Sequence, residues 1–535
     1  MSENTVQQEG LFWTPRGGNN ADEIWASCHE FSSVTTDKKT GKTEKTTVLV
    51  DMGQIEKPRN VLAGSYGKVV PALDDCLTVP GCEKPENEAK AVFLTHAHSD
   101  HIAGVFEYLS MGVKLPPIYG SDYTIKTLWK EFLDRGIKRE NQPELKTIKA
   151  GDRIKIGSMT VEAFSASHSV PGCFSFKISD KNASVFHSGD TKADPSSFLG
   201  NGVDMESYDK IGGVDLMTFD ATATNMDGHA TYESEIFDEY RKLFKENKGK
   251  QIIAVLPAAH MERLATVISA AESTGTDVLL NGGASMEQNV MALKLGGYDL
   301  QDRCPSIRFA SANSEKAKEI DPKKAITITT GIYGEANSPF VQKLLGEKSG
   351  FVLSDDAVVI APTYGSASEK IENLIVEHAP AGVKIIAGKD AKIYGSGHAQ
   401  ADDFVKIAKH VRPAAVIPIH CSKKMAESLN FLAQKNGYWT IPEYPHNGTT
   451  VSVGKDKCRI VSVKEPAWFG VNHILSADGS EKVEFVKNGD NGYSSEKTAE
   501  TLKDRQAKAS QKIADFHRKR ALNNALLIKR NGHGR

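Results

Sequence analysis

FLTHAHSDHIAG, residues 93–104, concentrates three histidines and one aspartate within six positions. The stretch follows the apolar run AVFLT at 91–95, so we expect it in the loop at the carboxyl end of a strand, where open sheets bind ligands. Imidazole nitrogens and a carboxylate oxygen suit Zn²⁺. Histidines and aspartates also cluster in turns by chance, but the pattern H-x-H-x-D-H directly after a strand favours a metal site. The expected ligands are His96, His98, Asp100 and His101.

Further ligands are expected at the ends of other predicted strands. His168 follows the predicted strand 159–164, Asp190 follows 184–187, and His420 follows 414–419. Each of these residues alone is weak evidence, but together they complete the ligand count for two ions. The first set is His96, His98 and His168, the second is Asp100, His101 and His420, and Asp190 bridges them. Two zinc ions about 3.5–4 Å apart can hold a hydroxide for an in-line displacement.

Asp51 ends the predicted strand 46–51 and is expected to orient the ligand loop by hydrogen bonding, without binding metal itself. His187, His229 and His260 lie near these motifs and are expected to pack or to face solvent.

Composition indicates a multidomain globular protein. A length of 535 residues predicts roughly two to four domains. The formal net charge of −2 argues against a uniformly basic nucleic-acid surface. Seven scattered cysteines without a CxxC pair fit a reducing cytosol, and no apolar run approaches the roughly 20 residues of a membrane span. We therefore expect a cytoplasmic protein with no membrane contact.

The order of the predicted secondary-structure elements changes after Asp220. Predicted strands and helices alternate from there, which indicates a parallel α/β unit. The strands are expected at 251–256, 277–280 and 325–329, and the helices near 259–274 and 284–295. Residues 503–535 hold ten Lys or Arg against two Asp, so this tail is either a solvated basic helix or a contact for a polyanion or a protein.

Several motifs resemble known families. The order H-x-H-x-D-H, a later His, a later Asp and a final His resembles the metallo-β-lactamase fold, which serves many hydrolases. FDATATN (219–225), GSGHAQADDF (395–404) and PIHC (418–421) resemble the three motifs of the β-CASP nucleases, whose insertion covers the metal site. ITTGIYGEANSPF (328–340) narrows the resemblance to the ribonuclease J family.

The resemblance implies an α/β fold: an αββα metallo-β-lactamase sandwich, an inserted parallel α/β β-CASP domain and a small C-terminal α+β domain. The implied division is 1–214 for the first part of the sandwich domain, 215–377 for the insertion, 378–450 for the second part of the sandwich domain, and 451–535 for the C-terminal domain with its basic tail.

The resemblance also implies a zinc-dependent ribonuclease that cuts single-stranded RNA as a 5′–3′ exonuclease, an endonuclease or both, and that forms homodimers or larger homo-oligomers. Asp220 and His398 would be its catalytic pair, with His398 assisting the leaving oxygen, and Ser396 and Gly397 would contact substrate.

This chain departs from the family pattern at several positions. Ala221 replaces the usual Ser, and GGASM (282–286) replaces a Gly-Arg-Ser stretch. These changes put the 5′-phosphate pocket in doubt and leave the choice between exonuclease and endonuclease open. Arg263 either faces phosphate or lies on a helix surface. Three other functions remain open: a DNA-directed β-CASP nuclease, a small-ester hydrolase on the same fold, and a non-catalytic RNA-binding subunit.

Overall fold

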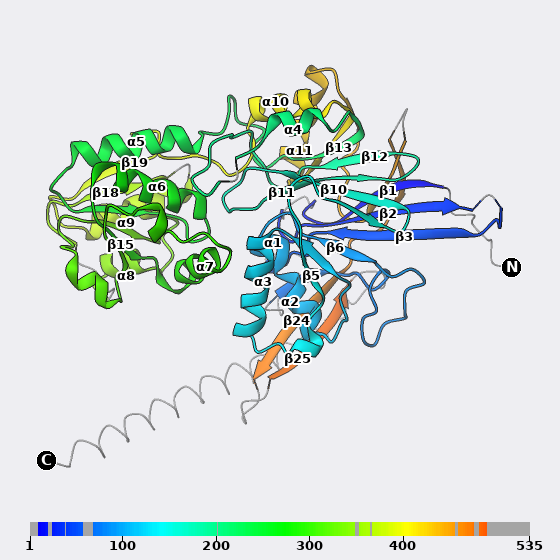
Figure 1. Cartoon of the computed structure of the whole chain (residues 1–535), viewed down its shortest axis with the longest axis horizontal. Coiled ribbons are helices and arrows are strands. Elements are labelled where there is room, and N and C mark those ends of the chain that lie inside the picture. The colour runs from blue at the N-terminus through cyan, green and yellow to red at the C-terminus, as the bar shows by residue number, and fades with distance from the viewer. Residues whose placement is uncertain are drawn as a thin grey trace, which may run out of the picture.

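The computed structural model describes residues 9–19, 24–37, 39–56, 68–200, 202–347, 353–363, 366–454, 458–475 and 481–488. Two bodies lie side by side in Figure 1, a larger one that contains both chain ends of the described part and a smaller one drawn in green. The predicted basic tail at 503–535 lies outside the described residues. Within them, no helix combines the length and the apolar character needed to cross a bilayer.

The larger body is a sandwich of two sheets. The first sheet, in spatial order, contains β23 (Arg459–Val463), β22 (Thr449–Val453), β1 (Gly10–Gly17), β2 (Cys28–Thr36), β3 (Thr43–Val50), β6 (Ala91–Phe93), β7 (Ile118–Gly120) and β8 (Leu145–Thr147). The second contains β21 (Trp439–Thr440), β20 (Pro413–Ile419), β13 (Val214–Asp220), β12 (Ser184–His187), β11 (Phe174–Ser179), β10 (Met159–Ser165) and β9 (Arg153–Ile156).

Side chains that are buried at every second position along the strands pack the two sheets together. Along β10, Met159, Val161 and Ala163 are buried while the residues between them are only half-buried. The inner faces meet in a cluster in which Phe93 packs its ring edge on Phe176 at a centroid distance of 5.7 Å. Alternating side chains of this kind place one apolar face against the other sheet.

Helices cover both outer faces of the sandwich. The first sheet carries α1 (Ser99–Ile102), α2 (Gly104–Ser110) and α3 (Asp122–Asp134), followed by the 3₁₀ turn η1 (Arg139–Asn141). The second sheet carries α4 (Met205–Asp209), α10 (Ala401–Val411) and α11 (Lys423–Lys435). This layering confirms the predicted αββα sandwich.

The smaller body is one parallel sheet flanked by helices. Its strands, in spatial order, are β16 (Phe309–Ser311), β15 (Val278–Asn281), β17 (Ile326–Thr329), β14 (Ile252–Val255), β18 (Val358–Ala361) and β19 (Lys384–Ala387). Every pair in it is parallel. Its other elements are α5 (Glu233–Glu246), α6 (Met261–Thr274), α7 (Gly283–Leu295), α8 (Pro339–Leu344), α9 (Ser366–His378), η2 (Gln301–Arg303) and η3 (Glu315–Glu319).

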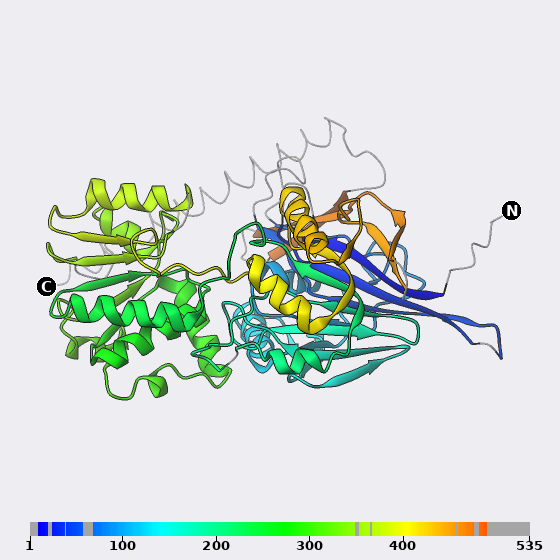
Figure 2. The ribbon, with the colours of Figure 1, turned by 90° about the horizontal axis from the view of Figure 1, so that it is seen from above.

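The expected parallel α/β insertion is therefore present. Both ends of helix α6 are capped. At its start the side chain of His260 accepts from the backbone N–H of Arg263, and at its end Gly275 adopts φ 64°. In Figure 2 the yellow segment before α10 and the green segment before α5 connect the two bodies.

Strand pairing near the predicted domain limits is specific. β13 pairs with β12 and β20 in the sandwich, whereas β19 pairs with β18 in the inserted sheet. Residues 215–220 therefore group with the sandwich and 384–387 with the insertion. The division of the chain at 214, 377 and 450 stays a prediction.

A fourth sheet joins distant parts of the chain. It contains, in spatial order, β25 (Glu481–Asn488), β24 (Trp468–Leu475), β5 (Lys68–Pro71) and β4 (Ile55–Glu56). Within this sheet, Val70 of β5 pairs with Phe469 of β24. The C-terminal strands thereby contact the sandwich domain.

Candidate metal centre

The HAHSDH turn lies at the carboxyl end of β6, as its position after an apolar run predicts. Gly53 makes the approach of the turn possible, since a Cβ there would lie 1.7 Å from the carbonyl oxygen of Asp100. Ala97, in the middle of the turn, packs against the apolar cluster of the inserted domain. The turn therefore sits where the sandwich meets the insertion, with α1 beside that junction in Figure 1.

Three imidazoles converge on one point. Nε2 of His96 lies 2.9 Å from Nδ1 of His98, and Nε2 of His168 lies 3.2 Å from the same atom. His168 donates from Nδ1 to the carbonyl of Gly397 at 2.6 Å, which leaves the lone pair of Nε2 directed at the group. Burial lowers the pKa of all three histidines, so they are neutral bases, the form that binds a metal.

A second group lies beside the first. Nε2 of His420 is 3.2 Å from Oδ2 of Asp100, and Nε2 of His101 is 3.7 Å from that oxygen. The rings of His101 and His420 stack at a centroid distance of 5.3 Å. Asp100, His101 and His420 bring their ligand atoms within 4.8 Å of one another.

Asp190 lies between the two groups. Its Oδ2 is 3.9 Å from His96 Nε2 and 3.8 Å from His168 Nε2 on one side. On the other side it is 3.3 Å from His101 Nε2 and 3.8 Å from His420 Nε2. A single carboxylate that reaches both groups has the position of a bridging ligand.

The donor set fits a metal on two further observations. Oδ1 of Asp190 and Nε2 of His101 are buried and have no hydrogen-bond partner among the described residues. Buried polar atoms without partners are costly, and a cation between the two groups would satisfy both. The chain can therefore hold a metal cofactor here.

Asp51 and Thr95 orient the ligands from behind. Oδ2 of Asp51 accepts from Nδ1 of His101 at 2.7 Å, and Oδ1 accepts from the backbone N–H of Thr95 at 2.8 Å. The Thr95 hydroxyl donates to Asp51, so its oxygen is free to accept from Nδ1 of His96 at 3.0 Å. Both histidines thus keep Nε2 for the metal.

Backbone strain is concentrated at this site. Among the described residues, four that are not glycine have positive φ, and two of them are Asp51 at 63° and His420 at 52°. Such conformations cost free energy and persist where the surroundings hold them. Asn19 holds His420 by accepting from its backbone N–H at 3.1 Å, and Thr222 contacts its Nδ1 at 2.9 Å.

Asp220 and His398 form a pair at the edge of the metal cluster. Nδ1 of His398 lies 2.7 Å from Oδ2 of Asp220 and 3.9 Å from Oδ2 of Asp190. Asp220 is fully buried, and the side chain of His398 is 22% exposed. Burial disfavours the charged form of His398, but attraction to Asp220 outweighs it and raises the pKa of His398 to about 9. A protonated His398 would face the solvent side of the site.

The remaining charges follow the same logic. Burial opposes ionisation of Asp190, yet His420 and His101 hold the pKa of Asp190 well below its usual range. Burial also opposes protonation of His101, but Asp190 and Asp51 raise the pKa of His101 well above its usual value. The carboxylates of Asp190 and Asp51 thus favour positive charge at His101, and for the same reason they would favour a bound cation beside it.

The two residues expected to contact substrate lie in the loop before α10. The hydroxyl of Ser396 accepts from the backbone N–H of His398 at 3.0 Å, and the carbonyl of Gly397 accepts from His168. Their contact with substrate stays a prediction.

Several other side chains differ from expectation or were missed. Both predicted positions of Arg263 were wrong, because the residue is 2% exposed and pairs with Glu233. His187 is buried and His260 is half-buried, whereas the side chain of His229 is 44% exposed. Sequence reasoning missed Thr95, Thr222 and Ser169; the last lies 3.0 Å from Nε2 of His98. Thr95 directly precedes the first histidine, and only its place in the motif could have indicated its role.

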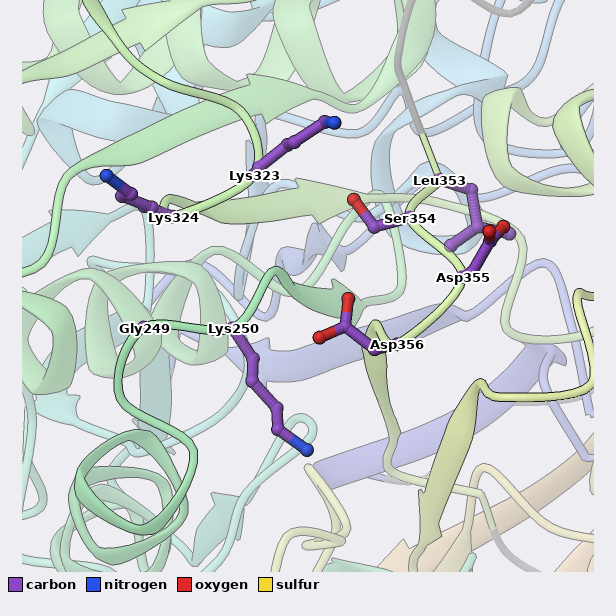
Figure 3. A pocket seen from close by; sticks show the side chains of 8 residues that line it. All are labelled: Gly249, Lys250, Lys323, Lys324, Leu353, Ser354, Asp355 and Asp356. Atoms are coloured by element: carbon purple, nitrogen blue, oxygen red, sulfur yellow. The ribbon is translucent and has the colours of Figure 1, made fainter.

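A separate hollow of about 440 Å³ lies on the inserted domain (Figure 3). It is lined by Gly249, Lys250, Lys323, Lys324, Leu353, Ser354, Asp355 and Asp356. These residues precede β14, β17 and β18, so the hollow lies at the amino ends of parallel strands, opposite the edge where such sheets bind ligands. Lysines and aspartates mix in it and no histidine lines it, so the metal cluster is the better candidate.

The chain is similar to two known domain families. A family described as the beta-lactamase superfamily domain matches residues 74–253. A family described as the Zn-dependent metallo-hydrolase RNA specificity domain matches residues 390–442. The two matches together contain all of the candidate ligands and both members of the Asp220–His398 pair.

Whole proteins named Ribonuclease J are also similar to this chain. The chain is 27% identical to Ribonuclease J of Mycolicibacterium smegmatis over 399 residues, which cover 73% of this chain and 69% of that protein. It is also 27% identical to Ribonuclease J of Thermus thermophilus over 356 residues, covering 65% of this chain and 61% of the relative. Ribonuclease J2 of Bacillus subtilis is 26% identical over 356 residues, covering 66% and 62%.

A solved structure shares the fold. The crystal structure of a protein of unknown function from Enterococcus faecalis superposes with a TM-score of 0.56 at 17% identity. The match covers 85% of this chain and 100% of the other. At this identity the likeness concerns the fold alone.

Proposed function

Since the chain belongs to the ribonuclease J family, we propose that it is a zinc-dependent ribonuclease that hydrolyses phosphodiester bonds of single-stranded RNA. The observation that carries the proposal is the pair of ligand groups joined by Asp190, with the Asp220–His398 pair beside them. A small-ester hydrolase would need the metal groups but not a second acid–base pair at their solvent edge.

The ligands divide into two sets in this proposal. His96, His98 and His168 would hold one Zn²⁺, and Asp100, His101 and His420 the other, with Asp190 shared. Such a metal pair, when bound, supplies a nucleophile at neutral pH and neutralises charge on the phosphate. Histidine nitrogens and carboxylate oxygens are ligands that zinc accepts.

The protein's own residues orient the reaction. Asp51 fixes the ring of His101, and Gly397 fixes the ring of His168 through its carbonyl. Asp220 holds His398 by its Nδ1 atom, which leaves Nε2 for the substrate. Protonated His398 would donate a proton from Nε2 to the departing 3′ oxygen, and Asp220 would stabilise the charge until that proton leaves.

Substrate selection is proposed to rest on phosphate contacts at the junction of sandwich and insertion. Ser396 and Gly397 would approach a phosphate with hydroxyl and backbone N–H, since the small residues of GSGHA leave the backbone accessible. We keep both exonuclease and endonuclease action open, because GGASM replaces an arginine-containing stretch in the insertion.

The proposed cellular setting follows from the family and from the thiols. All seven cysteines are free and six of them are buried, which fits a reducing cytosol. Homodimers or larger homo-oligomers are proposed from the family resemblance, and light scattering of the purified chain tests them.

The experiment that tests the function pairs metal content with cleavage. The purified chain and its His98→Ala variant are analysed for bound zinc, then incubated with single-stranded RNA carrying a 5′ monophosphate, the same RNA with a 5′ triphosphate, and matching DNA. We expect about two zinc ions per chain, the number that a shared-carboxylate site holds. RNA cleavage should depend on zinc, and His98→Ala should lose both metal and activity.

Each rival function has its own outcome in this experiment. Faster cutting of DNA than of RNA would favour the DNA-directed nuclease. Zinc binding with turnover of a small ester and no nucleic-acid cleavage would favour the ester hydrolase. Tight RNA binding without metal-dependent cleavage would favour the binding subunit. Shortening from the monophosphate end indicates exonuclease action, and internal fragments indicate endonuclease action.

A further inference from the structure

A buried arginine of the inserted domain reaches the loop that carries His398. Arg263 lies in the first turn of α6 and is 2% exposed. Its Nη1 donates to the carbonyl of Ile393 at 2.9 Å, and its Nη2 donates to the carbonyl of Gly395 at 3.3 Å. These carbonyls belong to the segment that runs directly into residues 396–398, so the guanidinium fixes the backbone just before the catalytic histidine.

Glu233 aligns the guanidinium. Nε and Nη2 of Arg263 donate to the two carboxylate oxygens of Glu233, each at 3.0 Å. Thr266 donates its hydroxyl to Oε2 of Glu233 at 2.7 Å. Because the guanidinium is planar, this two-point contact sets the direction of its remaining N–H groups, which an ammonium group cannot reproduce.

The same carboxylate faces the metal-ligand loop. Nζ of Lys192 lies 3.5 Å from Oε1 of Glu233 and 3.1 Å from Oδ2 of Asp194. Lys192 is fully buried and follows Asp190 by two positions. Lys192, Arg263, Glu233 and Asp194 therefore form a buried network of balanced charge, the condition under which such groups remain ionised inside a protein.

The loop has little room to settle elsewhere. A Cβ on Gly395 would lie 2.7 Å from the carbonyl oxygen of Thr231, 2.8 Å from Cδ1 of Ile236 and 3.0 Å from Nη2 of Arg263. The backbone at Gly395 is thus enclosed by the inserted domain. Beyond it, Gly397 accepts from His168, and His398 pairs with Asp220.

We propose that Arg263 is a positioning residue for His398: aligned by Glu233, it fixes the carbonyls of residues 393 and 395 and thereby the placement of His398. The inference rests on the proposed nuclease function, because the placement of His398 matters only if His398 acts on a substrate. It gives the inserted domain a second task, that of holding part of the catalytic apparatus.

The test uses Arg263→Lys, which keeps the charge and removes the planar fork. Its matched control is Arg308→Lys, since Arg308 pairs with Asp277 on the surface of the same domain. Hydrogen–deuterium exchange of peptides covering 391–400, zinc content, kcat and KM are measured for both variants. They are measured again in a His398→Ala background.

The expected result is specific to Arg263→Lys. Amide exchange should accelerate in 391–400, zinc content should stay at the parent value, and kcat should fall roughly 10- to 100-fold, as for small displacements of a catalytic group. KM should change little. In the His398→Ala background the same substitution should cost no further activity. Arg308→Lys should match the parent throughout.

Other results overturn the proposal. An equal loss of kcat with and without His398 would mean that Arg263 does not act through His398, and unchanged exchange would mean that it does not hold the loop. If Arg263→Lys does not fold, Thr266→Val replaces it, because it removes the hydroxyl that contacts Glu233 and the backbone carbonyl of Glu262 but leaves every charge of the network in place. A parent that cuts no RNA would refute the proposed function, while the exchange data would still decide whether Arg263 holds the loop.

Discussion

His398 and Asp220 contact each other through Nδ1 and Oδ2 at 2.7 Å, with the carboxylate fully buried and the imidazole partly open to solvent. A second histidine, in α10, offers a comparison: Nδ1 of His410 lies 3.0 Å from Oδ1 of Asp209, but there the carboxylate side chain is 59% exposed and the imidazole 31% exposed. Only the first pair borders the metal ligands. The protein thus contains one His–Asp pair beside the metal ligands and another away from them, and the second pair can serve as a control for the first.

The first prediction concerns His398→Ala. Loss of the proton donor should lower kcat roughly 10²- to 10⁴-fold, the range for general acid catalysis. Zinc content should stay near the parent value, because His398 is proposed as an acid and not as a ligand. Elemental analysis and RNA cleavage measure both quantities, and His410→Ala is the control. Loss of one zinc would instead make His398 a ligand, since its ring lies in a group with Asp190, Asp220 and His420.

The second prediction concerns Asp51→Asn. The single side-chain oxygen of the new asparagine can still accept from the backbone N–H of Thr95. The NH₂ group of the asparagine would then face the Nδ1–H of His101. Two opposed donors favour the other tautomer of His101, which has no lone pair at Nε2. Zinc affinity should fall about 10- to 100-fold, as for other residues that orient metal ligands. Competition with a chelator measures it, and Asp134→Asn on the surface of α3 should leave it unchanged.

The ligand positions could be predicted from the sequence because each ligand segment follows an apolar run that is recognisable as a strand. His96, His168, Asp190 and His420 come from four different loops, and the sheets bring those loops to one place. The sequence predicts that these four loops meet only when a particular fold is assumed. The parallel insertion was predicted from the alternation of strands and helices along the chain, whereas the sandwich was predicted from the resemblance to the metallo-β-lactamase fold.

The supporting residues were not readable for a physical reason. Arg263 lies in AAHMERLATV, where its spacing fits a helix surface as well as a buried face, and its partner Glu233 is 30 positions away. A buried ion pair depends on two distant residues meeting, so neither local sequence reveals it. The pairing of β24 with β5 is hidden in the same way, because its partners are separated by about 400 residues of chain.

The third prediction concerns Gly397→Ala. A Cβ at Gly397 would lie 2.7 Å from Cε1 and 2.8 Å from Nδ1 of His168, closer than such atoms approach. Because the ring of His168 is held on its other side by the ligand group, the loop must move. Zinc affinity and kcat should both fall at least about tenfold, the scale seen when a catalytic group is displaced by a fraction of an ångström to an ångström. Gly296→Ala is the control, since its nearest contacts are 3.4 Å away; equal behaviour of the two variants would contradict the prediction.

The fourth prediction concerns Glu262 and the pH dependence of stability. Burial raises the pKa of this carboxyl from 4.5 to about 7, against the effect of the Ser197 hydroxyl that donates to it at 2.7 Å. Since the folded pKa exceeds the unfolded one, the contribution of Glu262 to the free energy of unfolding is highest below pH 4.5, falls as pH rises, and levels off above about 7.

Glu262→Gln stays neutral and should remove this part of the pH dependence. A pKa difference of this size corresponds to about 3 kcal/mol between the two limits. Urea unfolding at pH 5 and pH 8.5 measures it, and Gln should make the variant relatively more stable at the higher pH. The amide fits the site, because its oxygen can accept from the backbone N–H of Phe198 while its NH₂ donates to the Ser197 oxygen. Glu315→Gln, on an exposed turn of the same domain, should leave the parent's pH profile unchanged. A parent and a Glu262→Gln variant with parallel pH profiles would mean that Glu262 is ionised in the folded protein.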